Sequence, residues 1–203
     1  MIPLRPILPA RARPERGARH PLLEIAHAAV AAHVRGRDVY AAVRIAVEML
    51  PPEPAHGPRP PLSPAHLPAQ SCFVSLKAHG RLRGCIGTLA PTQPSLALEI
   101  AENAMAAATR DPRFAPVAAS ELEHLNISID LLSALELARS AEDLDPRRYG
   151  LVLRSGTRSG VLLPDLPQVR TAEQQIAVCR EKAGLDADTP VHMLRFTVDR
   201  IGE

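Results

Sequence analysis

The sequence is poor in aromatic residues and lacks the patterns that mark a membrane protein. Its 203 residues include no tryptophan, three phenylalanines and two tyrosines, which weighs against RNA recognition by bases stacked on aromatic rings. No apolar run approaches the ~18 residues that a membrane-spanning helix needs. A signal peptide, with its charged, apolar and small-residue regions, is also missing. We therefore expect a cytoplasmic protein without a membrane span.

Cysteine is scarce and widely spaced, at Cys72, Cys85 and Cys179. An odd number of distant cysteines argues against a disulfide framework and suits a reducing compartment. The Cys-x2-Cys and His-x3-His pairs that bind zinc are missing, and so are the phosphate-binding loops GxxxxGK[ST] and GxGxxG. The sequence therefore predicts neither a metal site nor a cofactor.

Charge is unevenly distributed, although the formal net charge is only +2. Residues 1–20 hold five arginines against one glutamate, a balance of +4 that leaves −2 for the rest of the chain. Four prolines keep this segment from forming a helix. We interpret residues 1–20 as a disordered basic arm, and RNA binding through it is the less favoured alternative.

Residues 21–203 are predicted to form one α+β domain. The proline-rich stretch 51–68 reads as an extended surface connection. Strand pairs interleaved with single helices predict a mostly antiparallel sheet with packed helices. Apolar periodicity and capping signals place the helices at 21–50 (two helices), about 94–110 and 171–183, and the strands at 71–89, 125–131, 151–163 and 191–198.

The candidate chemistry lies in the segment Leu82-Arg83-Gly84-Cys85-Ile86-Gly87. Glycines inside a strand mark a bulge or a close approach to the backbone. Side chains alternate across a strand, which places Arg83, Cys85 and Gly87 on one face. With a two-residue turn at His79-Gly80, Val74 would oppose Cys85 and Cys72 would oppose Gly87, diagonal to Cys85. We expect this face to be core or the floor of a pocket.

Two interpretations of this face remain open. A guanidinium beside Cys85 would lower the pKa of the thiol, giving a reactive cysteine next to an anion-binding arginine. Alternatively, Cys85 is a small residue in a tight strand and Arg83 sits in a structural salt bridge, because a buried arginine needs an anion. Asp130 is a possible partner for Arg83, and Asp111 is expected to clamp its loop through Arg113. Cys179 is expected in the core, and His192 is either a histidine at the core edge or a general base.

The motif LRGCIG resembles the hallmark of the AMMECR domain, protein A of the AmmeMemoRadiSam system. The likeness continues in family order over about residues 71–200. The segments that carry it are CFVSLKAHGRLRGCIGT, AENAMAAATRDPRFAPV, ELEHLNISIDLLS, YGLVLRSGTRSGVLLP and CREKAGL.

The resemblance implies an α+β domain with a larger and a smaller subdomain. It also implies partners: a Memo-like protein of dioxygenase-like fold and a radical-SAM protein, whose Cys-x3-Cys-x2-Cys run this chain lacks. We expect a pocket in which Cys85 acts as nucleophile or covalent tether for an anionic small molecule. Its lining would comprise Arg83, Gly84, Gly87, Asp111, Arg113 and Asp130. Whether the chain is an enzyme stays open, and the alternative is a non-catalytic adaptor for these partners or for RNA.

Overall fold

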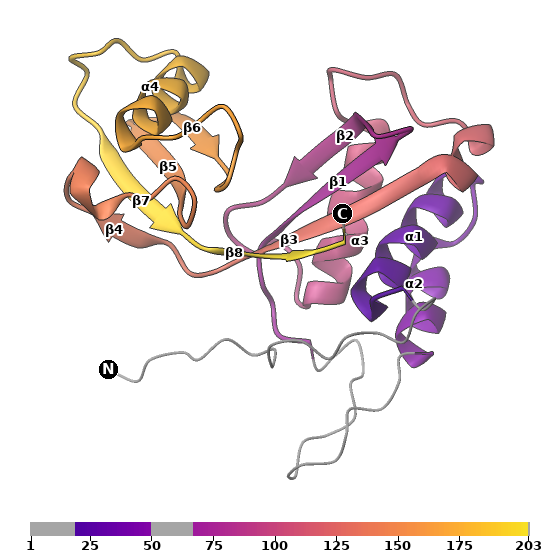
Figure 1. Ribbon diagram of the computed structural model, residues 1–203. Coiled ribbons are helices and arrows are strands. Elements are labelled where there is room, and N and C mark those ends of the chain that lie inside the picture. Colours follow the sequence, from indigo (N-terminus) through magenta and orange to yellow (C-terminus); the bar gives the residue numbers. More distant parts are fainter. Residues whose placement is uncertain (1–18, 50–66, 203) are drawn as a thin grey trace, which may run out of the picture. The chain divides into compact units, whose positions relative to one another are not determined.

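The computed structural model describes residues 19–49 and 67–202, in two compact units (Figure 1). Unit 1 lies within Met1–Leu131 and Arg200–Glu203, and unit 2 is Leu132–Asp199. The predicted basic arm and the proline-rich connection fall almost wholly outside the described residues. Among the described helices, none has the length and apolarity needed to cross a bilayer.

Unit 1 is a four-stranded sheet covered on one side by helices (Figure 1). The strands run in the order β2-β1-β3-β8, and β1 is antiparallel to both of its neighbours. The elements are α1 (Pro21–Val34), α2 (Val39–Glu48), β1 (Cys72–Ala78), β2 (Arg81–Gly87), α3 (Leu96–Thr109), the 3-10 helix η2 (Ala119–His124), β3 (Leu125–Leu132) and β8 (Val198–Ile201).

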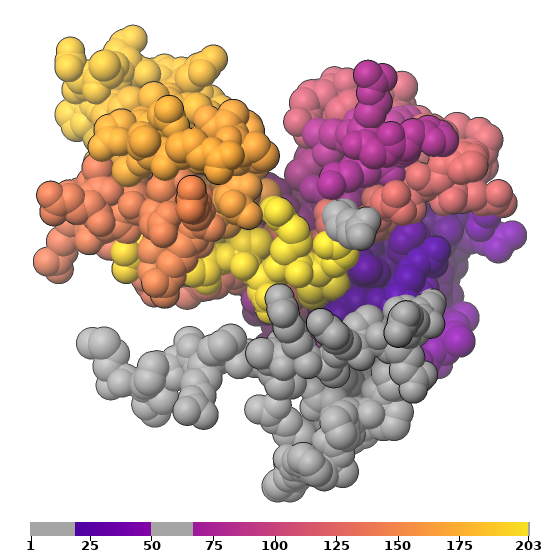
Figure 2. All heavy atoms as spheres, in the orientation of Figure 1, coloured from indigo at the N-terminus to yellow at the C-terminus, as the bar shows by residue number. Residues whose placement is uncertain are grey.

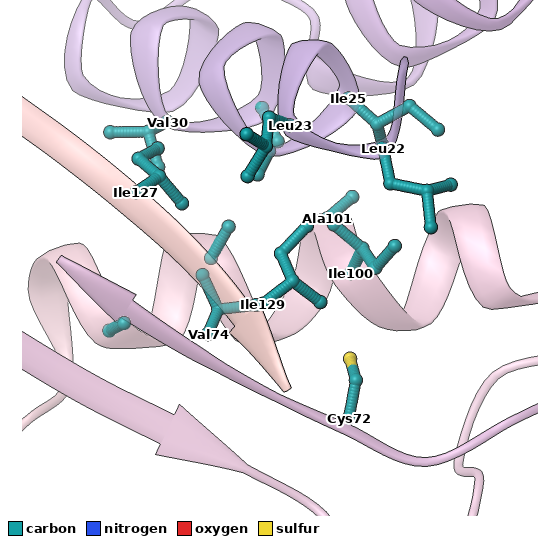
Figure 3. Close-up of a cluster of buried hydrophobic side chains, with 14 of the residues drawn as sticks. Leu22, Leu23, Ile25, Val30, Cys72, Val74, Ile100, Ala101, Ile127 and Ile129 are labelled. Atoms are coloured by element: carbon teal, nitrogen blue, oxygen red, sulfur yellow. The ribbon is translucent and has the colours of Figure 1, made fainter. Parts of the chain in front are cut away.

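The core of unit 1 lies between this sheet and the helices, as Figure 3 shows. Val30 of α1 lies beside Ile127 of β3, and Ile25 of α1 and Ile129 of β3 belong to the same buried cluster. In β1, Cys72, Val74 and Leu76 are fully buried on the helix side. Because side chains alternate along a strand, Phe73, Ser75 and Lys77 lie on the opposite side, which we call the open face.

Unit 2 has its own sheet and its own apolar core. Its elements are β4 (Glu136–Ala138), the 3-10 helix η3 (Ala141–Asp143), β5 (Gly150–Ser155), β6 (Arg158–Leu162), α4 (Ala172–Ala183) and β7 (His192–Phe196). The strand order is β4-β7-β5-β6. The expected capping box joins Thr171 and Gln174 at the start of α4, and Gly184 ends the helix with φ 62°.

The two units repeat one topology: a β-hairpin, a helix, then a strand that pairs with the first hairpin strand. Counted from the second hairpin strand, the orders are β2-β1-β3-β8 and β6-β5-β7-β4. Both hairpins carry a glycine directly under the following helix. A Cβ on Gly84 would lie 2.0 Å from the Ala107 carbonyl oxygen, and one on Gly160 would lie 1.9 Å from that of Cys179. Helix backbone therefore packs against strand backbone at equivalent points.

The structure confirms the α+β class and its antiparallel sheets, but it corrects the hairpin register. A bulge leaves Arg83 without a partner, because Leu82 pairs with Lys77 and Gly84 with Leu76. Cys85 consequently opposes Ser75 instead of Val74, and Gly87 opposes Phe73 instead of Cys72. One extra residue shifts every later side chain to the other face of the sheet.

Candidate functional site

The corrected register places Cys85 on the open face of unit 1, not in its core. In Figure 1 this strand side faces the viewer, with α3 behind the sheet, and Figure 2 draws the atoms in the same orientation. Ser75 lies between Cys85 on β2 and Ser128 on β3, and its hydroxyl donates a hydrogen bond to Cys85 Sγ at 3.2 Å. These three residues form a small polar row across the sheet. Of the two places expected for this face, the core is therefore wrong, and the floor of a pocket stays a prediction.

Asp111 fastens the loop after α3 to the edge of the sheet. Its buried carboxylate accepts the Cys85 N–H at 2.8 Å, on the side of β2 that has no neighbouring strand. The same carboxylate accepts Nε and Nη2 of Arg113 at 2.9 and 2.7 Å. These bonds, with that of Arg113 foremost, hold the pKa of Asp111 well below its usual range. The predicted clamp of Asp111 on its loop through Arg113 is thus confirmed.

The Arg83 side chain binds Glu121 and the loop before it, and not Cys85 or Asp130. Its Nε and Nη2 donate to the Glu121 carboxylate at 2.7 and 3.0 Å, and Nη1 donates to the Ala115 carbonyl at 2.7 Å. Hydrogen bonding to Glu121 raises the pKa of Arg83, and the same bond lowers that of Glu121. Of the two interpretations, the structural salt bridge is the one observed. The expected partner Asp130 instead pairs with Arg200 at 2.7 Å.

The pKa of the Cys85 thiol is raised, whereas a guanidinium beside the thiol would lower it. Cys85 is partly exposed, but burial raises its pKa and outweighs the lowering by the Ser75 hydrogen bond and by the charge of Arg113. Asp130 and Asp111 raise the pKa further. The expected lowering by Arg83 is therefore wrong, and the guanidinium that acts on Cys85 is that of Arg113. The Arg113 side chain is 56% exposed.

Gly84 and Gly87 serve packing in this structure. Gly84 faces α3, whose backbone it contacts, so it lies on the side of the sheet away from Cys85. A Cβ on Gly87 would lie 2.3 Å from the Phe73 ring. This aromatic ring covers the glycine across the strand pair. The predicted close approach to the backbone is real, and the approaching groups are a helix and a ring of the same chain.

The remaining thiols and His192 take no part in the polar row of unit 1, and Cys179 and His192 belong to unit 2. Cys72 is buried on the helix side with a pKa raised to about 12, so the predicted adjacency of Cys72 and Cys85 is wrong. Cys179 is a core thiol of unit 2, as expected, with a pKa raised to about 12 by burial. His192 is exposed on β7. Across residues 19–49 and 67–202, no three His, Cys, Asp or Glu side chains are grouped to hold a metal.

Sequence reasoning missed Glu99, a fully buried carboxylate on α3. It accepts the backbone N–H groups of Thr92 and Gln93 at 2.8 and 2.7 Å, together with the Thr88 hydroxyl. Glu99 thereby closes the loop between β2 and α3. The available signal was its place on the apolar stripe of α3, three residues after Leu96. A carboxylate at such a position needs internal donors.

Unit 2 has the same strand topology as unit 1, but apolar residues take the positions of the polar row. Gly160 occupies the position of Gly84, and the residue after it is Val161 where unit 1 has Cys85. Val152 takes the place of Ser75, and Leu194 that of Ser128. The topology alone therefore does not require a thiol beside two serine hydroxyls in one row. The polar row of unit 1 is the strongest candidate site among the described residues.

Two proteins of other organisms are similar to this chain over about 130 residues each. A protein of Thermotoga maritima is 50% identical over 130 residues, covering 63% of this chain and 75% of its own. Protein CA_C1420 of Clostridium acetobutylicum is 43% identical over 128 residues, and the match spans only 27% of that longer protein.

A solved structure and a family match agree with these relatives. The crystal structure titled "Uncharacterized Protein PH0010 From Pyrococcus horikoshii" superposes with a TM-score of 0.69 at 26% identity, covering 88% of each chain. The family described as AMMECR1 matches residues 23–201, which include both units and the Cys85 hairpin. The chain belongs to the AMMECR1 family.

Proposed function

We propose that the open face around Cys85 binds an anionic small molecule, with Arg113 as the anion anchor and Cys85 in contact with the bound molecule. One observation carries this proposal: a thiol that accepts a hydrogen bond from a serine hydroxyl stands where unit 2 has a valine, and the charge of the exposed Arg113 guanidinium acts on it. Nε and Nη2 of Arg113 each donate one hydrogen bond to the Asp111 carboxylate. Among the described residues Nη1 donates no hydrogen bond, and Cζ of Arg113 lies 5.4 Å from the centre of the Phe114 ring. The two N–H groups of Nη1 are the donors that this proposal assigns to the anion.

The raised pKa of Cys85 bears on the chemistry. A thiolate, not a thiol, is the nucleophile, so the unliganded protein at neutral pH holds a protonated Cys85. Binding with the thiol as a contact is therefore the function supported best. A covalent tether or catalytic role requires a substrate that accepts the thiol proton as the sulfur–carbon bond forms.

We also propose, from the family resemblance alone, that this binding step belongs to a pathway. On this proposal the chain is a cytoplasmic component that works beside Memo-like and radical-SAM proteins and handles an anionic intermediate. An adaptor without chemistry is the second candidate. The exposed apolar side chains of Tyr40 and Ile45 on α2, and of Met49 directly after it, favour it. RNA binding through residues 1–20 is tested by deleting them, because a lost arm contact reduces the salt dependence of affinity.

The anion site is tested with two alkylating probes of similar size, iodoacetate, which is anionic, and neutral iodoacetamide. We expect the ratio of their rates at Cys85 to exceed the ratio for a cysteine peptide. Arg113→Gln should bring the ratio down to the peptide value. Arg81→Gln removes an equal charge from an exposed position on β2 and should leave the ratio unchanged. Peptide mapping assigns the label, since Cys72 and Cys179 are buried.

A wild-type ratio equal to that of the peptide would remove the anion-binding proposal. A raised ratio that Arg113→Gln leaves intact would remove Arg113 as the anchor. If Arg81→Gln lowers the ratio as much as Arg113→Gln does, the preference for iodoacetate comes from the overall positive charge of this surface and not from an anion site at Arg113.

A further inference from the structure

Two histidines lie next to each other where the β1–β2 hairpin turns. The centres of the His79 and His124 rings are 5.1 Å apart, and the ring planes are tilted by 35°. His79 directly follows β1, and His124 ends η2 directly before β3. Because Ala78 pairs with Leu125 in the antiparallel ladder of β1 and β3, the backbone itself places the two histidines opposite each other.

The turn that carries His79 has a backbone conformation that residues other than glycine seldom adopt. Ala78 pairs with Arg81, which leaves a two-residue turn, and φ is 51° at His79 and 75° at Gly80. Two positive φ angles are typical of a type I′ turn, whose first central residue is most often asparagine, aspartate or glycine. Backbone strain of this kind gathers at binding sites. The imidazole at position 79 therefore indicates a role beyond the turn itself.

The separation of the two rings suits two ligands of one metal ion. In zinc sites the ring nitrogen lies about 2.0–2.1 Å from the metal, which puts the ring centre about 3.2 Å away. Two imidazoles at a tetrahedral angle then have their centres about 5.2 Å apart, and at a right angle about 4.5 Å. The observed 5.1 Å falls within this range. Both histidines are exposed, so either ring can turn a nitrogen toward the ion.

We propose that His79 and His124 together bind one divalent transition-metal ion of the class of Zn²⁺, Ni²⁺ and Cu²⁺, for which neutral imidazole is a common ligand. Within the part of the chain that the structure describes, no third His, Cys, Asp or Glu completes a group with them. The remaining coordination positions belong to water or to a donor atom of another molecule. With two protein ligands, the site binds its ion less tightly than a structural zinc site with four.

The charges around the pair do not attract a cation. Lys77 and Arg81 stand two residues to either side of His79, and Glu123 stands beside His124. Binding therefore depends on coordination by the two imidazoles and not on a negative surface. Mg²⁺ and Ca²⁺ prefer oxygen ligands and should not bind here.

The proposed metal site is separate from the polar row that contains Cys85. Cys85 lies four residues after Arg81 on β2, a length of about 13 Å along a strand. A metal–thiolate bond is only about 2.3 Å long, so Cys85 is not a ligand of this ion. The inference therefore does not depend on the anion-binding function proposed above.

Protection of the histidines against diethylpyrocarbonate tests the chelate, because the reagent acylates the unprotonated ring nitrogen that a metal would occupy. The full chain is labelled over a series of Ni²⁺ concentrations, and peptide mapping reads each histidine separately. His192, exposed on β7 of unit 2, is the internal control. We expect Ni²⁺ to protect His79 and His124 together, at a concentration roughly tenfold or more below that for His192, because the second imidazole binds intramolecularly. Mg²⁺ should protect none of the three.

Two variants separate chelation from binding to single histidines. His79→Asn keeps a residue that tolerates positive φ, and His124→Gln changes an exposed position. Each should raise the Ni²⁺ concentration that protects the remaining histidine of the pair to the value for His192. Protection of the pair only at the His192 concentration, or of one member alone, overturns the proposal. Protection that persists in both variants, or that Mg²⁺ provides equally, overturns it as well.

Discussion

At the scale of single residues, Asp111 links the loop after α3 to strand β2. Its carboxylate is 4% exposed and bonds to the Cys85 N–H and to two nitrogens of the Arg113 side chain. An edge strand with unpaired N–H groups invites pairing with other chains, and a side chain that covers such a group prevents it. The clamp therefore protects β2 and at the same time positions Arg113 beside the thiol.

We predict that Asp111→Asn lowers the free energy of unfolding by about 2–3 kcal/mol at pH 7, the range for hydrogen bonds to charged groups. The folded pKa of Asp111 lies below its unfolded value, which is about 3.9. The stabilisation is therefore complete above the unfolded pKa and is lost as the pH falls toward the folded one. Urea unfolding at a series of pH values should show a flatter acid limb for the variant.

Asp188→Asn is the control for this measurement, because Asp188 is exposed. It should change the free energy of unfolding by no more than about 0.5 kcal/mol, as for other surface substitutions. An acid limb for Asp111→Asn as steep as that of the wild type would show that the clamp does not stabilise the fold.

Glu99→Gln should also lower the free energy of unfolding, because it leaves buried donors without an acceptor. A glutamine amide would direct an NH2 group at donors that now bond to the carboxylate, the Thr92 and Gln93 N–H groups or the Thr88 hydroxyl. Leaving such buried donors unsatisfied costs about 1–3 kcal/mol, measured by chemical denaturation. Glu102→Gln on the same helix removes an exposed ion pair with Arg110 and should cost less than about 1 kcal/mol. Equal costs for the two variants would contradict the buried role of Glu99.

The pH dependence of Cys85 alkylation is the third prediction at this scale. Because burial raises the thiol pKa, iodoacetamide should react more slowly at pH 8 than with a free cysteine, and the rate should climb at higher pH. Ser75→Ala removes a hydrogen bond that favours the thiolate and should shift the rate profile to still higher pH. Quantitative mass spectrometry of the Cys85 peptide gives the profile. If the midpoint of the rate profile lies at or below the pH found for free cysteine, the thiol is already activated in the unliganded protein and this prediction is wrong.

At the scale of elements, the glycines explain why the hairpin motif has its composition. The Cβ of Gly84→Ala would meet a helix backbone oxygen, which can move only if α3 moves. That of Gly87→Ala would meet the base of the Phe73 ring at 2.3 Å and the Cys72 carbonyl oxygen at 2.6 Å, so its approach to backbone is less close than the 2.0 Å at Gly84. We predict a loss of about 1–3 kcal/mol or more for Gly84→Ala, as for overpacked cores, and a smaller loss for Gly87→Ala. Thermal unfolding compares the two, and the reverse order would contradict this account.

The long elements were predictable because their signals are local. The helices and hairpins follow from apolar periodicity, caps and turn residues, all read within about 15 residues of sequence. Strands β4 and β8, of three and four residues, are too short to show a period. They form because a neighbouring strand offers them a partner.

The candidate site was only half predictable, and the bulge at Arg83 is the reason. Glycine at position 84 is compatible both with a regular strand and with a bulge, so the sequence does not reveal which face Cys85 takes. The acids that hold Arg83 and Arg200, Glu121 and Asp130, are 38 and 70 residues away along the chain. Only the tertiary fold selects such partners. Asp111 and Arg113 were found because their contact is local.

At the scale of the whole molecule, residues 19–49 and 67–202 form two hydrophobic cores. The core of unit 1 comprises side chains from α1, α3, β1 and β3, whereas that of unit 2 is built around Leu151, Leu153, Leu162 and Cys179. Separate cores allow separate opening, because cooperative units of a protein can unfold locally at different free energies. The candidate anion site lies wholly in unit 1, since Cys85, Ser75 and Arg113 all belong to it.

Gly160→Ala tests this division, because the added Cβ would meet the Cys179 carbonyl oxygen and must separate β6 from α4. We predict that hydrogen–deuterium exchange speeds up in peptides of residues 150–162 and 172–183, while the β1–β2 hairpin keeps its protection. Iodoacetamide labelling of Cys85 should stay at the wild-type rate, and Cys179 should become labelled as its core opens. Gly84→Ala should produce the converse pattern. If Gly160→Ala instead exposes both cores equally, the two units unfold as one, and the Cys85 site depends on the packing of unit 2.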